Sequence, residues 1–256
     1  MGTPPAATSP NGMAENKEAL RRHFRSIRKA TPDGKRRRLD AARQAVALDL
    51  LEELGRRLAE EAGRPWQPIS VANGRLPGGD DSPSDLTGGT FGHNGFGHTG
   101  LTVAIYLSRP PEPDSTNLAA ALYRSGWHVI VPSPGRARKP WSQPAWSWYG
   151  EPPQIGPRGV PVAPSWSLPA ELAVADVIIL PGLAGAADGT RLGYGGGWYD
   201  RALPDASPDA PRWLLLNDDE FVDSLPVEPH DERVDVIVTP SGAHRCAATP
   251  DENEDG

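Results

Sequence analysis

The sequence predicts an α/β fold, in which a single domain has an open, mostly parallel or mixed sheet flanked by helices. Short apolar runs of strand length recur at 101–108 (LTVAIYLS), 127–134 (WHVIVPSP), 175–182 (ADVIILPG), 212–217 (RWLLLN) and 234–240 (VDVIVTP). A helical segment over 115–125 separates the first two runs. Strand, helix and strand at this spacing are typical of a parallel crossover.

Two helices are predicted ahead of the first strand. Leu20, Phe24 and Ile27 follow an i, i+4, i+7 pattern, which gives a helix starting at Lys17 one apolar face. Thr31 and Pro32 suit the N-cap and first position of a second helix, which we expect to end near Gly63. The other faces of the first helix are basic, with Lys17, Arg21, Arg22, Arg25, Arg28 and Lys29.

Changes in composition set the boundaries of the domain. Residues 1–14 are polar and aperiodic, so we expect a disordered tail before a domain at 15–245. Within that domain, 64–100 is rich in glycine and proline and is interpreted as a loop insertion. The Trp-rich segment 139–166 is predicted to be mostly irregular with short strands, and 246–256 to be an acidic tail.

The bulk composition excludes several classes of function. A formal net charge of -7 argues against non-specific binding to nucleic acid or to an anionic membrane. The single cysteine, Cys246, rules out an internal disulfide and a cysteine-based zinc site. No run approaches the roughly 20 apolar residues of a membrane span. The N-terminus lacks the apolar core of a signal peptide, so we expect a cytoplasmic protein.

The most informative motif is GTRLGYGGGWYDRAL at 189–203. It follows a predicted buried strand and runs into the start of a helix, a context in which glycine-rich backbone binds phosphate through its N–H groups. Arg191 can clamp a phosphate and Asp200 can ligate Mg²⁺. The motif is neither a P-loop nor a G-x-G-x-x-G fingerprint, so an ordinary turn is the alternative. The flanking Arg191, Tyr199 and Asp200 favour a nucleotide site.

Three other groups of residues carry possible chemistry. Lys17 and Arg21 are four residues apart, so they either converge on a polyphosphate or form a solvated basic face. Glu112 follows the first strand, where ligands of open α/β sheets bind, unless it is only loop surface beside a helix cap at Asp114 or Ser115. The acidic segment 227–235 (VEPHDERVD) can supply a carboxylate to a Mg²⁺ site shared with Asp200.

Other reactive or aromatic side chains are given no chemical role. His93 and His98 lack a third ligand and a rigid scaffold, so they are interpreted as loop residues. Cys246 has no evident base nearby in the sequence. Tryptophans at 141, 146 and 148 can stack on a flat ring, but Trp more often fills a core or covers a sheet edge.

Four segments, taken in order, resemble the 5-formyltetrahydrofolate cyclo-ligase family. LPGLAGAADGTRLGYGGGWYDRAL resembles its Arg-Leu-Gly-x-Gly-x-Gly-aromatic-Tyr-Asp-Arg signature. KEALRRHFR is similar to its N-terminal helix, YLSRPPEPDST to its strand-then-Glu segment, and LPVEPHDERVDVIVTP to its C-terminal His-Asp element. The resemblance covers 17–240 apart from 64–100.

The resemblance implies an ATP- and Mg²⁺-dependent ring closure of 5-formyltetrahydrofolate to 5,10-methenyltetrahydrofolate, with release of ADP and phosphate. By this likeness Asp200 and Asp231 hold magnesium, and Leu107 and Glu112 line the folate pocket. The implied partners are therefore a reduced folate and ATP, with Mg²⁺ as cofactor, and we expect a monomer. The residues implied to contact ATP are Lys17, Arg21, Arg191, Leu192, Gly193, Tyr194, Gly195, Gly196, Gly197, Trp198 and Tyr199.

The sequence departs from the family pattern in three places. Tyr194 and Gly196 stand where some members carry Arg and Lys, the aromatic pair is Trp198-Tyr199, and the loop at 64–100 is longer than usual. One alternative function is a non-catalytic nucleotide- or folate-binding regulator of the same family. Another is a sugar-phosphate or acyl-CoA enzyme on a similar sheet, for which the sequence offers no convincing nucleophile or base.

Overall fold

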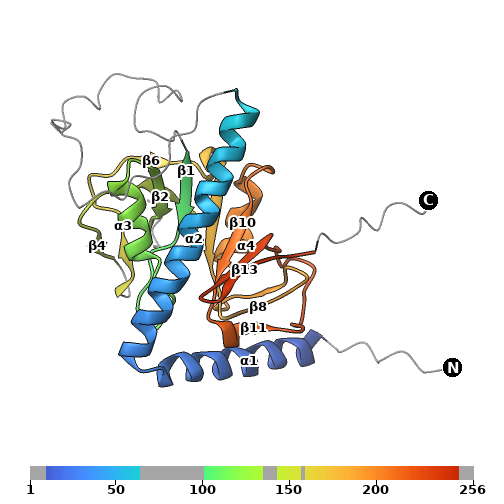
Figure 1. Ribbon diagram of the computed structural model, residues 1–256. Helices are drawn as coiled ribbons and strands as arrows, with labels where there is room; N and C mark the ends of the chain where they lie inside the picture. The colour runs from blue at the N-terminus through green and yellow to red at the C-terminus, as the bar shows by residue number, and fades with distance from the viewer. Residues whose placement is uncertain (1–9, 64–100, 135–142, 157–158, 248–256) are drawn as a thin grey trace, which may run out of the picture.

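The computed structural model describes residues 10–63, 101–134, 143–156 and 159–247. Its centre is an eight-stranded sheet with the strand order β13-β12-β10-β7-β1-β2-β3-β6 (Figure 1). The predicted apolar runs form the five central strands, which are all parallel. The mostly parallel α/β fold is thus confirmed. These strands are β1 (Thr102–Ile105), β2 (His128–Pro132), β7 (Val177–Pro181), β10 (Arg212–Leu215) and β12 (Val236–Thr239).

Antiparallel strands close both edges of this sheet. β13 (Gly242–Arg245) pairs with β12, while β3 (Trp146–Trp148) joins β2 to β6 (Pro169–Ala170). A three-stranded sheet follows the carboxyl ends of β7 and β10, and a two-stranded sheet lies in the Trp-rich segment. The three-stranded sheet comprises β8 (Ala184–Ala186), β9 (Arg191–Leu192) and β11 (Phe221–Val222). The two-stranded sheet comprises β4 (Gln154–Ile155) and β5 (Pro161–Val162).

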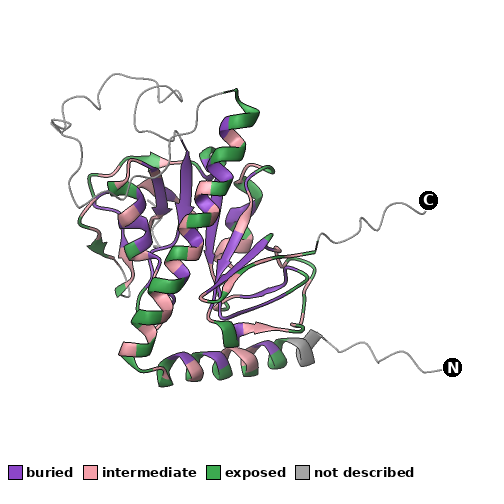
Figure 2. Ribbon diagram, in the orientation of Figure 1, coloured by how far each residue is buried: buried purple, intermediate pink, exposed green. Residues whose placement is uncertain are grey.

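The helices cover both faces of the large sheet. α2 (Asp33–Glu61) and α3 (Thr116–Arg124) pack on the face that carries Val103 and Ile105. The opposite face, which carries Ala104, packs against the 3₁₀ turn η3 (Leu172–Val174), the one-turn helix α4 (Trp198–Ala202) and η4 (Leu203–Asp205). Successive strand residues point to opposite faces, so continuous apolar runs are buried on both sides. Figure 2 shows the central strands buried and the outer helix faces exposed.

α1 (Pro10–Ala30) lies across one end of the molecule, near β8 and β11 (Figure 1). Phe24 packs with Leu183 and Leu192, which belong to the segment that follows β7. α1 therefore covers the edge where the parallel strands end, which is the edge at which open α/β sheets bind ligands. Among the described residues, every helix is too short or too polar to cross a lipid bilayer.

Several boundaries differ from the sequence expectations. α1 begins at Pro10, so residues 10–14 belong to a helix rather than to the expected tail. Pro32 is the N-cap of α2, and the Thr31 hydroxyl instead donates to the carbonyl of Ile27, in the last turn of α1. The predicted loop at 64–100 and residues 248–256 of the acidic tail lie outside the described residues.

Candidate active site

The glycine-rich segment forms a loop between β9 and α4. It does not follow β7 directly, because the β8–β9 hairpin intervenes. Gly195 and Gly197 have φ values of 94° and 57°, a region that side chains other than glycine rarely adopt. Gly197 is also the N-cap of α4, which has only 5 residues. The glycines therefore permit a tight turn whose backbone is partly open to solvent.

Arg191 and Asp200, at the two ends of this loop, are paired with each other. The Arg191 Nη2 donates to Asp200 Oδ1, and the same carboxylate accepts a longer bond from the backbone N–H of Glu232 at 3.4 Å. Arg191 is only 7% exposed, and its Nε has no hydrogen-bond partner within the described part of the chain. A buried guanidinium N–H without a partner is costly, so an incoming acceptor would satisfy it.

Two basic residues of α1, Lys17 and Arg21, contact the acidic segment and the glycine loop. Lys17 is 4% exposed, and its Nζ donates to Glu228 Oε2 at 2.6 Å and to Asp231 Oδ2 at 2.5 Å. The Arg21 Nε donates to the carbonyl of Gly193 at 3.1 Å. The structure therefore brings α1 together with both the glycine loop and the acidic segment, as convergence on one ligand requires.

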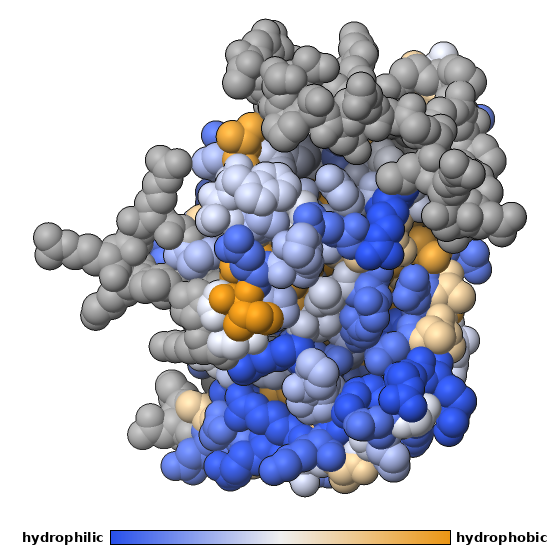
Figure 3. Space-filling model, turned by 90° about the vertical axis from the view of Figure 1, so that its left-hand side faces the viewer, coloured by the Kyte–Doolittle hydropathy of each residue, from blue (hydrophilic) through white to orange (hydrophobic). Residues whose placement is uncertain are grey.

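Figure 3 shows the hydrophilic surface at the end of the molecule where α1 and the start of α2 lie. Arg22, Arg25 and Lys29 of α1 are exposed there. The outer side of α1 is therefore a solvated basic surface, whereas Lys17 is buried and Arg21 is partly buried.

Within the described ranges, Glu228, His230 and Asp231 form a group of potential cation ligands. One ligand atom from each lies within 4.8 Å of the others. Carboxylate oxygens are the ligands that Mg²⁺ prefers, so the donor set suits a hard cation. Asp200 does not belong to this group and connects to it only through the backbone of Glu232. The two predicted metal ligands, Asp200 and Asp231, thus lie on adjoining segments. The Lys17 ammonium donates a hydrogen bond to Asp231.

Glu112 lies in the loop after β1, next to residues of the glycine loop and α4. Its Oε2 accepts a hydrogen bond from the backbone N–H of Arg109 at 2.9 Å. Burial is the main cause that raises the pKa of Tyr106, Tyr194 and Tyr199, and the negative charge of Glu112 raises each of them further. Because these tyrosines come from three different segments, Glu112 is close to all three segments.

The helix-cap interpretation applies to the neighbouring Asp114. Its Oδ1 accepts the backbone N–H of Asn117 at 3.0 Å, as a capping side chain does. Ser115 occupies the N-cap position, but its hydroxyl donates to the carbonyl of Tyr106 at 2.6 Å instead. Glu112 is therefore not needed to cap α3. Leu107, the other residue implied to line a folate pocket, is 5% exposed and packs in the core under α2 and α3.

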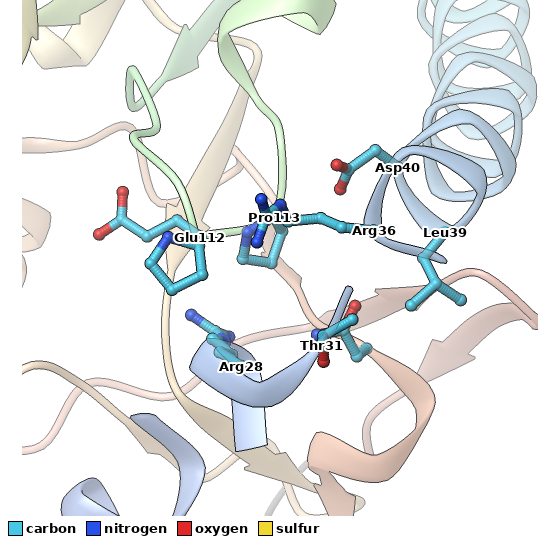
Figure 4. Close-up of a pocket in the computed structure, with 9 residues that line it drawn as sticks. Arg28, Thr31, Arg36, Leu39, Asp40, Glu112 and Pro113 are labelled. Atoms are coloured by element: carbon cyan, nitrogen blue, oxygen red, sulfur yellow. The ribbon is translucent and has the colours of Figure 1, made fainter. Parts of the chain in front are cut away.

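A pocket lies beside Glu112, between α1, α2 and the loop after β1 (Figure 4). In this view Arg28 extends from α1 toward Glu112 and Pro113, while Arg36 and Asp40 come from α2. Sequence reasoning did not assign a role to Arg28 or Asp40. The lining residues are Arg28, Thr31, Arg36, Leu39, Asp40, Pro111, Glu112, Pro113 and Asn217.

An aromatic cluster lies at the start of α4. The ring centroids of Trp198 and Tyr199 are 4.8 Å apart, and Trp146 of β3 lies 5.5 Å from Trp198 and 6.4 Å from Tyr199. Trp146 is 5% exposed, which confirms the core-filling interpretation for this residue. Trp141, His93 and His98 lie outside the described residues.

Comparisons with known proteins agree on one family. Residues 98–240 match the model of the 5-formyltetrahydrofolate cyclo-ligase family. The chain is 36% identical over 153 residues to a 5-formyltetrahydrofolate cyclo-ligase of Mycolicibacterium smegmatis, which covers 57% of this chain and 77% of that protein. It is 32% identical over 146 residues to a 5-formyltetrahydrofolate cyclo-ligase of Escherichia coli K12, covering 55% of this chain and 78% of the relative.

Solved structures support the same fold. The chain resembles the 5,10-methenyltetrahydrofolate synthetase of Aquifex aeolicus with a TM-score of 0.58 and 20% identity, over 94% of this chain and 99% of that one. A 5,10-methenyltetrahydrofolate synthetase of Mycoplasma pneumoniae gives a TM-score of 0.54 and 16% identity, over 88% and 99%. The family match contains Glu112, the glycine loop and the acidic segment, whereas Lys17 and Arg21 precede it.

Proposed function

Because the chain belongs to the 5-formyltetrahydrofolate cyclo-ligase family and is an enzyme of that family, we propose that it closes 5-formyltetrahydrofolate to 5,10-methenyltetrahydrofolate with MgATP. ADP and phosphate are the other products. The observation that carries this proposal is the convergence of α1, the glycine loop and the acidic segment, to which Lys17 and Arg21 contribute. Glu112 lies near the same loop, since its charge contributes to the raised pKa of Tyr194.

The glycine loop is the proposed binding site for the ATP phosphates. Its backbone N–H groups can donate hydrogen bonds to phosphate oxygens. The N–H of the buried Arg191 Nε can donate another. Lys17 and Arg21 add positive charge from α1. Phosphoryl transfer depends mainly on positioning and charge neutralisation, which this set of donors supplies.

Asp200 and Asp231 are the proposed magnesium ligands, with Glu228 and His230 close to Asp231. A bound Mg²⁺ would neutralise phosphate charge during the transfer. In the structure Asp200 is paired with Arg191 and Asp231 with Lys17, so each carboxylate is oriented by a cation. When the phosphates bind, both cations have a second anion to contact.

The reaction needs ATP because a formamide oxygen is a poor leaving group. The formyl oxygen attacks the γ-phosphorus of ATP, the bond from that phosphorus to the β-bridging oxygen breaks, and ADP leaves. N10 of the folate then attacks the activated carbon and loses its proton, while the carbon–oxygen bond breaks to release phosphate. The role of the protein in this step would be to hold N10 close to the activated carbon, which raises their effective concentration.

The folate is proposed to bind beside Glu112. A carboxylate accepts hydrogen bonds from the N–H groups of a pterin, and Tyr199 with its neighbour Trp198 offers ring surface for packing. Glu112 is partly exposed and fixed by the Arg109 backbone, so it can contact a ligand without being buried unpaired.

A steady-state assay tests the proposed function. Purified protein, MgATP and 5-formyltetrahydrofolate are mixed and the near-ultraviolet absorbance of the methenyl product is followed. Growth of absorbance that requires both ATP and Mg²⁺ supports the proposal. A flat trace from folded protein contradicts it, and calorimetry with ATP then separates a binding regulator from a chain that binds no nucleotide.

A further inference from the structure

The segment that carries Glu112 is shaped by local hydrogen bonds. We call it the Glu112 loop (residues 109–114). The backbone N–H of Glu112 donates to the carbonyl of Arg109 at 2.9 Å, which closes a turn. The hydroxyl of the buried Tyr106, just after β1, donates to the carbonyl of Pro113 at 2.9 Å. These contacts join neighbouring parts of the chain, so they shape the loop but do not attach it to another element.

Asp40 attaches the loop to α2. Its Oδ1 accepts a hydrogen bond from the backbone N–H of Asp114 at 3.1 Å, across 74 residues of chain. Asp114 is two residues after Glu112. Figure 4 shows Asp40 projecting from α2 toward the Glu112 loop, and Asp40 and Glu112 line the same pocket. A carboxylate that accepts from a backbone N–H forms a charge-assisted bond, which is stronger than a bond between neutral groups.

Asp40 is itself held in place by Arg43, one turn further along α2. The Arg43 Nη1 donates to the same Oδ1 at 2.7 Å. Its Nε donates to the carbonyl of Leu216 at 2.7 Å, and its Nη2 donates to Asn217 Oδ1 at 2.5 Å. Arg43 is 2% exposed, and a buried guanidinium held on three sides has little freedom. Because Leu216 and Asn217 follow β10 directly, the Glu112 loop is connected through Asp40 and Arg43 to the edge of the sheet where the parallel strands end.

We propose that Asp40 is a positioning residue of the folate site: it holds the Glu112 loop by the Asp114 N–H and so fixes the place of Glu112. This inference rests on the proposed function, which assigns the folate to Glu112. The start of the loop is fixed by β1, and the bond to Asp40 fixes its far end. Without that bond, the turn that carries Glu112 is attached at one end only.

The first test is an Asp40→Ala variant assayed with both substrates. This change removes the acceptor, and a hydrogen bond to a charged group is lost. The KM for 5-formyltetrahydrofolate is therefore expected to rise about tenfold, while the KM for ATP stays within about twofold. Asp40→Asn keeps a side-chain oxygen that can accept the Asp114 N–H, so it should restore the folate KM to within about twofold of the wild-type value.

The control for a merely structural effect is Leu54→Ala. Leu54 is a core residue of the same helix, 5% exposed, and its truncation leaves a cavity that lowers stability. Below its unfolding midpoint, this variant should keep both KM values. An unchanged folate KM in Asp40→Ala would overturn the proposal, as would an equal rise in both KM values or the same rise in Leu54→Ala.

A second variant covers the case in which Asp40→Ala does not fold, since that change leaves the buried Arg43 without its carboxylate. Combining Asp40→Ala with Arg43→Met removes the acceptor and the buried charge together, which a core tolerates better. The folate KM of the folded double variant should also rise about tenfold. A wild-type folate KM in this variant would contradict the role of Asp40.

A double-mutant cycle tests whether Asp40 acts through Glu112. In a Glu112→Gln background, Asp40→Ala should raise the folate KM by much less than tenfold, because the carboxylate that the loop places is already gone. If Asp40→Ala has the same effect in both backgrounds, Asp40 does not act through Glu112 and the proposal is wrong.

Amide hydrogen exchange, measured by NMR, tests the anchor apart from activity. The Asp114 amide should exchange about tenfold faster in Asp40→Ala than in the wild type, because its acceptor is lost, and Asp40→Asn should restore the slow rate. An inactive wild-type protein contradicts the proposed function, whereas equal exchange of this amide in the wild type and Asp40→Ala overturns the role of Asp40. For an inactive protein, calorimetric titration with 5-formyltetrahydrofolate replaces the KM comparison. Weaker binding by Asp40→Ala supports the proposal, and equal binding or no binding by the wild type overturns it.

Discussion

Arg28 of α1 and Glu220 at the end of η5 (Asp218–Glu220) form a bidentate ion pair, with Nε–Oε1 and Nη2–Oε2 distances of 2.6 and 2.7 Å. Burial alone would lower the pKa of Arg28, but the hydrogen bond and charge of Glu220 raise it, so the Arg28 guanidinium stays charged in the core. Glu220 also accepts the backbone N–H of Asn217 at 2.8 Å. The pair therefore ties α1 to the segment that follows β10, next to the glycine loop.

Glu220→Ala should strongly destabilise the fold, because it leaves the Arg28 charge buried without a partner. We expect a loss of about 3–5 kcal/mol in the free energy of unfolding, measured by urea denaturation. Glu151→Ala is the contrasting variant, since it breaks a pair with Arg124 whose side chain is 62% exposed. That change should cost less than about 1 kcal/mol. Equal losses in the two variants would contradict the importance of burial here.

Asp200→Ala should nearly abolish turnover while leaving the protein folded. The variant loses a proposed magnesium ligand and the carboxylate that pairs with Arg191. Steady-state rates at saturating substrates, together with the thermal unfolding midpoint, measure both consequences. The control is Asp205→Ala, at an exposed aspartate in η4, which should keep wild-type rates. A folded Asp200→Ala protein with normal activity would remove Asp200 from the site.

Glu112→Gln should raise the KM for 5-formyltetrahydrofolate about tenfold and that for ATP much less, since a charged hydrogen-bond acceptor is lost from the folate side only. Initial rates over a matrix of both substrates separate the two constants. Asp114→Asn, two residues along, alters the cap of α3 instead. Asp114→Asn should leave the KM for both substrates unchanged. If Glu112→Gln also leaves the KM for 5-formyltetrahydrofolate unchanged, Glu112 is an ordinary surface residue of the loop.

Lys17→Met should raise the KM for ATP about tenfold or more, because a charge-assisted contact to phosphate is lost while the apolar stem is kept. The same change leaves Glu228 and Asp231 without their shared cation. Arg22→Met, on the exposed side of α1, serves as the matched loss of charge and should have little effect. If Lys17→Met and Arg22→Met have similar KM values for ATP, Lys17 does not belong to the ATP site.

The Cys246 thiol should react slowly in the native protein. Burial, followed by the charges of Asp235 and Asp188, raises its pKa to about 11. Less thiolate is therefore present at pH 8 than in the unfolded chain, and we expect a disulfide reagent to react about a hundredfold more slowly than in urea. The native rate should rise about tenfold per pH unit up to that pKa. A pH-independent native rate would show that opening of the structure, rather than thiolate content, limits the reaction.

The central strands and the position of Glu112 follow from local sequence signals. Apolar runs mark strands that are buried on both faces, and parallel strands bring their carboxyl ends to one edge, which is where Glu112 and the glycine loop are found. The β8–β9 hairpin could not be predicted in this way. β8 is Ala-Gly-Ala and β9 is two residues long, so neither has the length or alternation that marks a strand.

The Arg28–Glu220 pair was missed for a different reason. Glu220 ends an acidic run, NDDE, which has the composition of a solvated turn. Arg28 did give a signal, since it follows Leu20 and Phe24 at intervals of four and so continues the apolar face of α1. A cation on such a face needs a buried anion. Only the tertiary structure identifies that anion, because it is 192 residues away.

The contacts of α1 also determine when the site can form. Lys17 meets Asp231 across 214 residues of chain, and Arg21 meets Gly193 across 172. During synthesis, the first helix therefore leaves the ribosome long before its partners exist. Contacts between such distant segments carry a high entropic cost of loop closure and form slowly. A nascent chain that ends before the acidic segment already has four of the five parallel strands, yet the ion pairs of Lys17 remain unmade.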